Sequence, residues 1–144
     1  MSTKYYYLVA SLPHLVFDQE NEVDVDGFLR YCERIMDTKD YELVIAAQLN
    51  DFPALPKSND VLAKWQAWEK TLRNELVRLR AQELGLDPVE FLAPVDEIPE
   101  AKDVAREAFN QESPLQAEIT LMRYRWNFLD QMGIGHFFDV EEII

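Results

Sequence analysis

The chain has few of the residues that strand-rich or disulfide-bonded proteins depend on. Four of its 144 residues are glycine, whereas sheet proteins use glycine in many of their tight turns. Its one cysteine, Cys32, rules out a disulfide within the sequence and suits a reducing compartment, so we predict a cytoplasmic location. No apolar run approaches the roughly 20 residues of a bilayer-spanning helix, and the N-terminus has no signal-peptide pattern.

Basic residues are also scarce. The sequence has 14 Lys and Arg against 27 Asp and Glu, which gives a net charge of -13. Nucleic acids and anionic membrane surfaces both attract clustered Lys and Arg, so this charge disfavours either as a partner. A basic protein partner suits the charge better.

Motifs that carry chemistry are missing as well. The stretch "GIGHFF" has two glycines and is not followed by the helix start that a phosphate-binding loop needs. One cysteine and two histidines, His14 and His136, show no metal-ligand spacing. Cys32 falls on the inward face of a predicted helix, so we interpret it as a core residue and not a nucleophile. We therefore predict a protein that is not an enzyme and has no cofactor or metal.

What the sequence does contain is helical periodicity. Six apolar residues recur every three or four positions and so share one helix face: Val61, Trp65, Trp68, Leu72, Leu76 and Leu79. They predict a helix over residues 60–84, about 37 Å long, which Gly85 ends. A helix of this length predicts an all-α fold, a compact bundle of about five to seven helices with residues 60–84 as its spine.

A second helix is predicted over residues 114–132. Ser113 is placed as the N-cap, with Pro114 at the first helical position and Gln116 completing a capping box. We expect a wide buried face made of two stripes, a core stripe and its neighbour. The core stripe is Leu115, Ile119, Met122, Trp126 and Leu129, and the neighbouring stripe is Ala117, Leu121, Tyr124 and Phe128.

The remaining residues are assigned to shorter elements of a single helical domain. Residues 24–52 predict a helical pair, in which Asp24 and Thr38 are the expected N-caps. Residues 53–59 form a linker, because its two prolines interrupt a helix. Residues 4–12 fit either a helix or a strand, and their tyrosines favour a strand.

Residues 87–112 form the most acidic part of the sequence. They carry eight acidic and two basic side chains. Such a charge run is typical of a solvated surface, so we expect an exposed acidic hairpin or arm.

The stretch "RYRWNFLDQMGIGHFFD" spans residues 123–139. It contains several charged and aromatic side chains that the predicted buried helix faces do not explain. Gly133 is expected to end the preceding helix in the left-handed conformation, so residues 133–144 form an elbow. Asp139 then caps a helix too short to be stable alone, and we expect either a truncated part of a longer chain or an end that docks on a partner. The predicted partner-binding residues are Arg123, Arg125, His136, Phe137 and Phe138.

Three stretches of the sequence resemble one known family: "KYYYLVASLPHLVFD", "DVDGFLRYCERIMDTKDYEL" and "RYRWNFLDQMGIGHFFDVEEII". This bacterial family is encoded within V-type (A-type-like) ATPase operons. Its members are similar to stand-ins for the socket component, the all-helical protein that joins the central stalk of the rotary ATPase to the membrane ring. The resemblance implies other V-type ATPase proteins of the stalk or ring as partners, and it brings no catalytic residue with it.

These observations leave three functional hypotheses. The leading one is a non-enzymatic accessory or coupling component of a V-type ATPase, held at the membrane periphery by other proteins of the complex. The second is an acidic helical adaptor, unrelated to ATPases, that binds a basic helix through residues 87–112. The third is a small hydrolase that uses His136 with a nearby acid such as Asp139.

Overall fold

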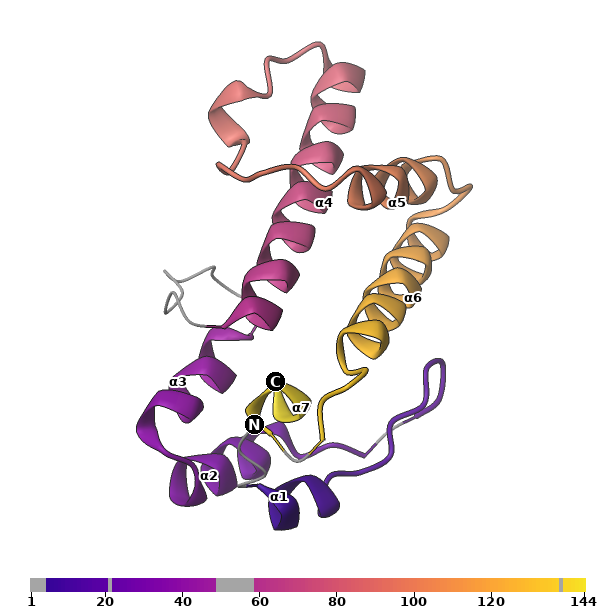
Figure 1. Cartoon of the computed structure of the whole chain (residues 1–144). Helices are drawn as coiled ribbons and strands as arrows, with labels where there is room; N and C mark the ends of the chain where they lie inside the picture. The colour runs from indigo at the N-terminus through magenta and orange to yellow at the C-terminus, as the bar shows by residue number, and fades with distance from the viewer. Residues whose placement is uncertain (1–4, 21, 49–58, 138) are drawn as a thin grey trace. The chain divides into compact units, whose positions relative to one another are not determined.

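The computed structural model describes residues 5–20, 22–48, 59–137 and 139–144. Within these ranges the chain is all-helical, with seven α-helices, one short 3-10 helix and no strand (Figure 1). The long helix α4 spans Asp60–Leu84, the bounds that the periodicity predicts. The all-α fold with one long helix is therefore confirmed.

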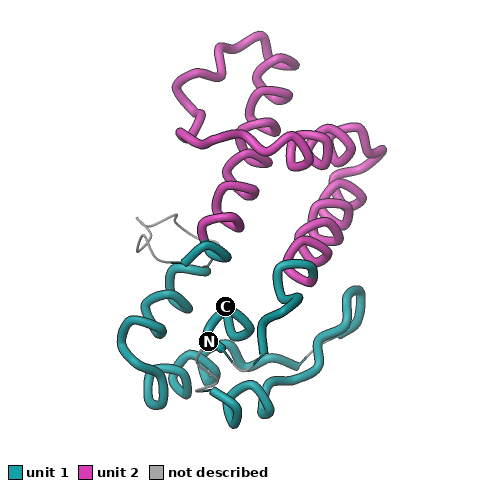
Figure 2. Tube along the Cα trace, viewed as in Figure 1, with its two compact units in different colours: residues 1–62, 131–144 teal, residues 63–130 magenta. Residues whose placement is uncertain are grey.

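The chain divides into two compact units (Figure 2). Unit 1 consists of Met1–Leu62 and Gln131–Ile144, and unit 2 consists of Ala63–Asp130. Helix α4 begins in unit 1 and continues through unit 2. Of the predicted linker 53–59, all but Asn59 lies outside the described residues. The expected single domain remains a prediction.

The tyrosines near the N-terminus favoured a strand, but the structure has a helix there. Helix α1 spans Tyr6–Ala10. Tyr5 and Leu8 are three residues apart, so one helical turn directs both inward, where they are 6% and 1% exposed. A strand would need a partner, and the described residues offer none. The local apolar spacing therefore outweighs the strand preference of tyrosine.

Three further helices complete unit 1: α2 (Val25–Ile35), α3 (Thr38–Ala46) and α7 (Val140–Ile143). Helix α3 packs against both α2 and α7. The expected inward position of the cysteine is confirmed, since its side chain is fully buried. The apolar core of the unit is formed by Tyr5, Leu8, Cys32, Met36, Val44 and Ile143.

Of the two N-caps predicted in this region, one is confirmed. The Asp24 carboxylate accepts a hydrogen bond from the backbone N–H of Gly27 at 2.9 Å. A Cβ atom on Gly27 would lie 2.2 Å from that carboxylate, so the cap requires glycine there. Thr38 is wrong as a cap, because α3 already includes it and Asp37 provides the extended backbone before the helix.

Unit 2 is built on α4. This helix ends as predicted at Gly85, which has a φ of +67°, and the N–H of Leu86 donates to the carbonyl of Ala81 at 2.8 Å. The predicted apolar face is largely confirmed, since Trp65, Trp68, Leu72 and Leu76 are all buried. The sequence did not predict that α4 also buries polar side chains: Gln66, Glu69, Thr71, Asn74 and Glu75.

The segment after α4 explains part of this polar burial, because Asn74 bonds the backbone of Ala93 and Thr71 accepts from the N–H of Ile98. Its acidic residues are exposed, as predicted, but the segment is not an arm. It contains the 3-10 helix η1 (Val89–Phe91) and helix α5 (Pro99–Phe109). Four small residues repeat at helical spacing and are buried, so α5 is packed and is not a free arm. They are Ala101, Val104, Ala105 and Ala108.

Helix α6 spans Pro114–Met132, the predicted bounds, and Ser113 caps it by accepting from the N–H of Gln116 at 3.2 Å. Its predicted core stripe is wrong in part, because Leu115, Met122 and Leu129 are 68%, 48% and 46% exposed. The neighbouring stripe supplies the buried residue, Leu121. The two stripes are similarly apolar, so the choice between them depends on what α6 packs against.

Candidate interaction surface

The structure divides the predicted partner-binding residues between the two units. Arg123 and Arg125 belong to unit 2, whereas His136 and Phe137 belong to unit 1. Phe138 lies outside the described residues. Arg123 and Phe137 are both exposed, and Phe137 is 68% exposed. The positions of Arg125 and His136 can be traced to contacts within the chain.

Arg125 forms a buried ion pair with Glu69 of α4. Its Nε lies 3.0 Å from Glu69 Oε2, and its Nη2 lies 2.7 Å from Oε1. Arg73 adds a third bond to Oε1 at 3.1 Å. The Glu69 side chain is fully buried and that of Arg125 is 15% exposed. Arg125 was predicted to bind a partner, and in the structure it binds an acid of its own chain, so we assign it to the packing of unit 2.

The same two helices also carry a cluster of aromatic rings. Trp65 and Trp68 of α4 have ring centroids 5.9 Å apart, and Phe128 of α6 stacks on Trp68 at 5.0 Å. These rings lie within one turn of Glu69 and of Arg125. Because apolar surroundings strengthen a paired charge and penalise an unpaired one, the pair fixes how α6 lies on α4.

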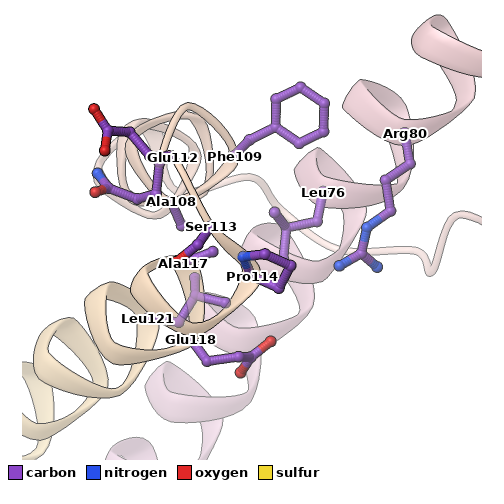
Figure 3. Close-up of a pocket in the computed structure, with 11 residues that line it drawn as sticks. Leu76, Arg80, Ala108, Phe109, Glu112, Ser113, Pro114, Ala117, Glu118 and Leu121 are labelled. Carbon is purple, nitrogen blue, oxygen red and sulfur yellow. The ribbon is translucent and has the colours of Figure 1, made fainter.

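A small cavity of unit 2 lies where α5 turns into α6 (Figure 3). Its volume is about 280 Å³. The charged side chains around it are Arg80, Glu112 and Glu118, and its apolar lining comes from α4, α5 and α6. Because this lining mixes both signs of charge with apolar side chains, it does not indicate a particular class of ligand.

In unit 1, the elbow after α6 holds His136 against the start of α7. Gly135, and not Gly133 as predicted, takes the left-handed conformation, with a φ of +85°. His136 Nδ1 lies 2.9 Å from Asp139 Oδ2. The other oxygen of Asp139 accepts from the N–H of Glu142 at 3.1 Å, so the predicted cap of α7 is confirmed. His136 thus orients the residue that starts the last helix.

A group of potential metal ligands occurs at this elbow. Single ligand atoms of His136, Asp139 and Glu141 all lie within 4.8 Å of one another. Each residue is already hydrogen-bonded within the chain, and Glu141 accepts from Asn59 at 3.3 Å. First-row metals bind such ligands at about 2.0–2.2 Å, so the group would have to contract and release those bonds. We interpret it as the junction between the start of α4 and α7.

The histidine–aspartate pair also resembles the base of a hydrolase, which needs a nucleophile beside it. Cys32 does not fit this role, because burial raises the pKa of its thiol and it belongs to the apolar core. Among the described side chains, no hydroxyl or thiol is hydrogen-bonded to the His136 ring. The geometry therefore gives the hydrolase hypothesis no second catalytic group.

Unit 1 has a recess that the sequence did not predict. It has a volume of about 570 Å³ and is formed by the loop before α2, the start of α2 and the end of α7. We call it the acidic groove, because its described lining contains three carboxylates and no Lys or Arg. The lining consists of Leu12, Pro13, Leu15, Glu22, Val23, Asp24, Phe28, Glu142, Ile143 and Ile144.

The apolar part of the acidic groove combines buried and accessible side chains. Ile143 is 7% exposed and Phe28 is half-buried against the core of unit 1. Leu15 and Val23 are each 43% exposed. An accessible apolar recess edged by carboxylates is a surface that can bind another protein, and it contains no catalytic constellation.

Comparisons of the chain with protein-family models, curated proteins and solved structures find no match. Within the described ranges, no helix is both long and apolar enough to cross a membrane. The interpretation of the acidic groove therefore rests on the chain's own residues.

Proposed function

We propose that the chain is a non-enzymatic accessory or coupling component of a bacterial V-type ATPase, similar to the socket component between stalk and ring, that acts by protein–protein contact. One observation carries the proposal. Eight of the ten residues that line the acidic groove belong to the three stretches that resemble the ATPase-operon family, and the exceptions are Glu22 and Val23.

The three stretches lie far apart in sequence, yet each contributes to the same recess. The first supplies Leu12, Pro13 and Leu15, the second supplies Asp24 and Phe28, and the third supplies the end of α7. The described lining has no His, Cys, Ser, Thr or Tyr side chain that could act beside its carboxylates as a base or nucleophile. A shared surface of this kind favours docking over chemistry, which is what a socket or stalk component requires.

Affinity purification of the intact protein from its native cells tests this proposal. We expect proteins of the central stalk or membrane ring to be recovered with the wild-type chain. Leu15→Asp, which places a charge in the groove, should abolish that recovery. Leu86→Asp is the matched control, because Leu86 is 59% exposed and belongs to unit 2. Recovery of the wild-type protein without any other ATPase protein would contradict the proposal.

The acidic groove also favours a second candidate, an adaptor unrelated to ATPases. Its three carboxylates suit a basic segment of any origin. The binding surface would then be this groove and not residues 87–112, where four buried residues hold α5 in unit 2. Purification of one basic partner that belongs to no ATPase would support this candidate.

A further inference from the structure

We infer, building on the proposed function, that the acidic groove binds a single amphipathic helix whose apolar face is flanked by Lys or Arg. The described lining contains Glu22, Asp24 and Glu142 but no basic side chain. The negative charge of this lining repels an acidic helix and gives a neutral helix no electrostatic attraction. A basic helix would offer each of them a cation.

The apolar lining explains why the ligand must also have an apolar face. Leu15 and Val23 remain partly exposed to solvent, whereas Phe28 and Ile143 in the same lining are more buried. Helices that bind in grooves insert apolar side chains spaced three, four and seven residues apart.

Backbone hydrogen bonding favours a helix over an extended peptide. An extended peptide usually gains affinity by adding a strand to a sheet edge, and the described residues contain no strand. Its N–H and C=O groups would therefore lack partners in an apolar groove. A helix satisfies these groups internally.

Charge argues against two other occupants. A second copy of this chain would bring another net charge of -13 toward the three carboxylates, so the two copies would repel each other. An anionic membrane surface would be repelled for the same reason. A basic helical segment of another protein is the occupant that fits both the apolar lining and the charge.

Fluorescence anisotropy with labelled synthetic helices tests the inference on the full chain. The probe is a Leu/Lys amphipathic peptide of about 18 residues, long enough to be helical when bound. Its control has the same pattern with Glu in place of Lys. We expect the Lys peptide to bind and the Glu peptide not to bind.

Two matched pairs of variants locate the binding site. Glu22→Lys should weaken binding of the Lys peptide about tenfold, as expected when one close charge pair is reversed. Glu83→Lys makes the same change in net charge on an exposed position of α4 in unit 2, and it should have a much smaller effect. Leu15→Asp and Leu86→Asp form the equivalent apolar pair. Circular dichroism checks that each variant remains folded.

Three results would overturn the inference. They are equal weakening by Glu22→Lys and Glu83→Lys, equal binding of the Glu peptide, and self-association that buries the groove, seen by sedimentation. The same variants separate it from the proposed function. If other ATPase proteins are still recovered with Leu15→Asp, the groove is wrong and the function stands. If the peptide binds the groove but no other ATPase protein is recovered, the function is wrong.

Discussion

The two compact units bury different chemistry, although α4 contributes to both. Unit 2 encloses a fully buried carboxylate, Glu69, paired with Arg125 and Arg73. Unit 1 encloses an apolar cluster, in which Tyr5 reaches outward to donate a hydrogen bond to Asp40. A buried charge is tolerated in one geometry only, whereas an apolar cluster accepts several.

Further ion pairs extend this difference across unit 2. Glu75 of α4 bonds Arg106 of α5 at 3.0 Å, and Arg78 bonds Glu97 at 2.6 Å. Glu97 also bonds Lys102 at 2.6 Å, which completes a network between the two helices. The acidic groove lies in unit 1. The core of unit 1 is an apolar cluster, whose contacts depend less on direction than ion pairs do. We therefore expect unit 2 to be the more rigid of the two and unit 1 to be able to adjust to a partner.

The largest effect is expected from breaking the buried pair of unit 2. Arg125→Met removes two of the three hydrogen bonds to Glu69 and leaves a buried carboxylate undercompensated. We expect a loss of about 3–5 kcal/mol in the free energy of unfolding, measured by urea denaturation. Arg73→Met is the control, since this side chain is 40% exposed and its loss should cost at most about 1 kcal/mol.

A double-variant cycle sharpens this result. Glu69→Gln combined with Arg125→Met removes both charges, so it should recover part of the stability that Arg125→Met loses. If the loss of unfolding free energy in the double variant equals the sum of the losses in the two single variants, then Glu69 and Arg125 are not coupled. Unit 2 would then owe its stability to its aromatic rings and not to the buried pair.

The next effect is expected in the core of unit 1. Leu8 is 1% exposed, so Leu8→Ala leaves a cavity and should cost about 2–5 kcal/mol. Hydrogen exchange should show the additional opening mainly in peptides of unit 1. Leu86→Ala, at a side chain that is 59% exposed, should change stability by less than about 0.5 kcal/mol. Equal additional exchange in both units would mean that they unfold together.

The bounds of the long helices were predictable because their signals are local. Ser113 and Gly85 mark a start and a stop within a few residues of the helix ends, and no distant contact alters that reading. The buried face of α6 was not predictable in this way. Its two stripes are similarly apolar, and the choice depends on Trp65 and Trp68 of α4, whose ring centroids lie 6.0 Å and 5.0 Å from that of Phe128.

The candidate sites were less predictable than the helices, because each joins residues that are distant in sequence. Glu69 and Arg125 are 56 residues apart. The one signal for this pair was a single acid, Glu69, directly after Trp68 on a predicted core face. The acidic groove likewise combines Leu15, Glu22 and Ile143. The pairing of His136 with Asp139 is local, at three residues, and the hydrolase hypothesis already named these two residues together.

A pH dependence at high pH is expected from unit 1. Burial, together with the hydrogen bond to Asp40, raises the pKa of Tyr5 to about 12. The unfolded value is about 10, so the neutral phenol stabilises the folded state fully below pH 10. This contribution is lost as the pH rises from about 10 through 12, and it amounts to at most about 3 kcal/mol.

Urea denaturation across this pH range checks the expectation. Tyr5→Phe cannot ionise, so its stability should fall less steeply than that of the wild type. Tyr124→Phe is the matched variant in unit 2, where the hydrogen bond to Glu107 raises the pKa of Tyr124. This tyrosine is less buried than Tyr5, and its effect should be smaller. Parallel pH curves for the wild type and Tyr5→Phe would contradict the assignment.

The smallest effects are expected at one helix cap in each unit. Asp24→Ala in unit 1 and Ser113→Ala in unit 2 should each cost about 1 kcal/mol. They differ in what surrounds them, since a Cβ on Gly27 would clash with the Asp24 carboxylate at 2.2 Å. Gly27→Ala should therefore destabilise the wild type. In the Asp24→Ala background it should stabilise α2 by about 1 kcal/mol, because alanine is the better helix former. A destabilising Gly27→Ala in both backgrounds, measured by thermal unfolding, would show that the glycine is required for a reason other than the cap.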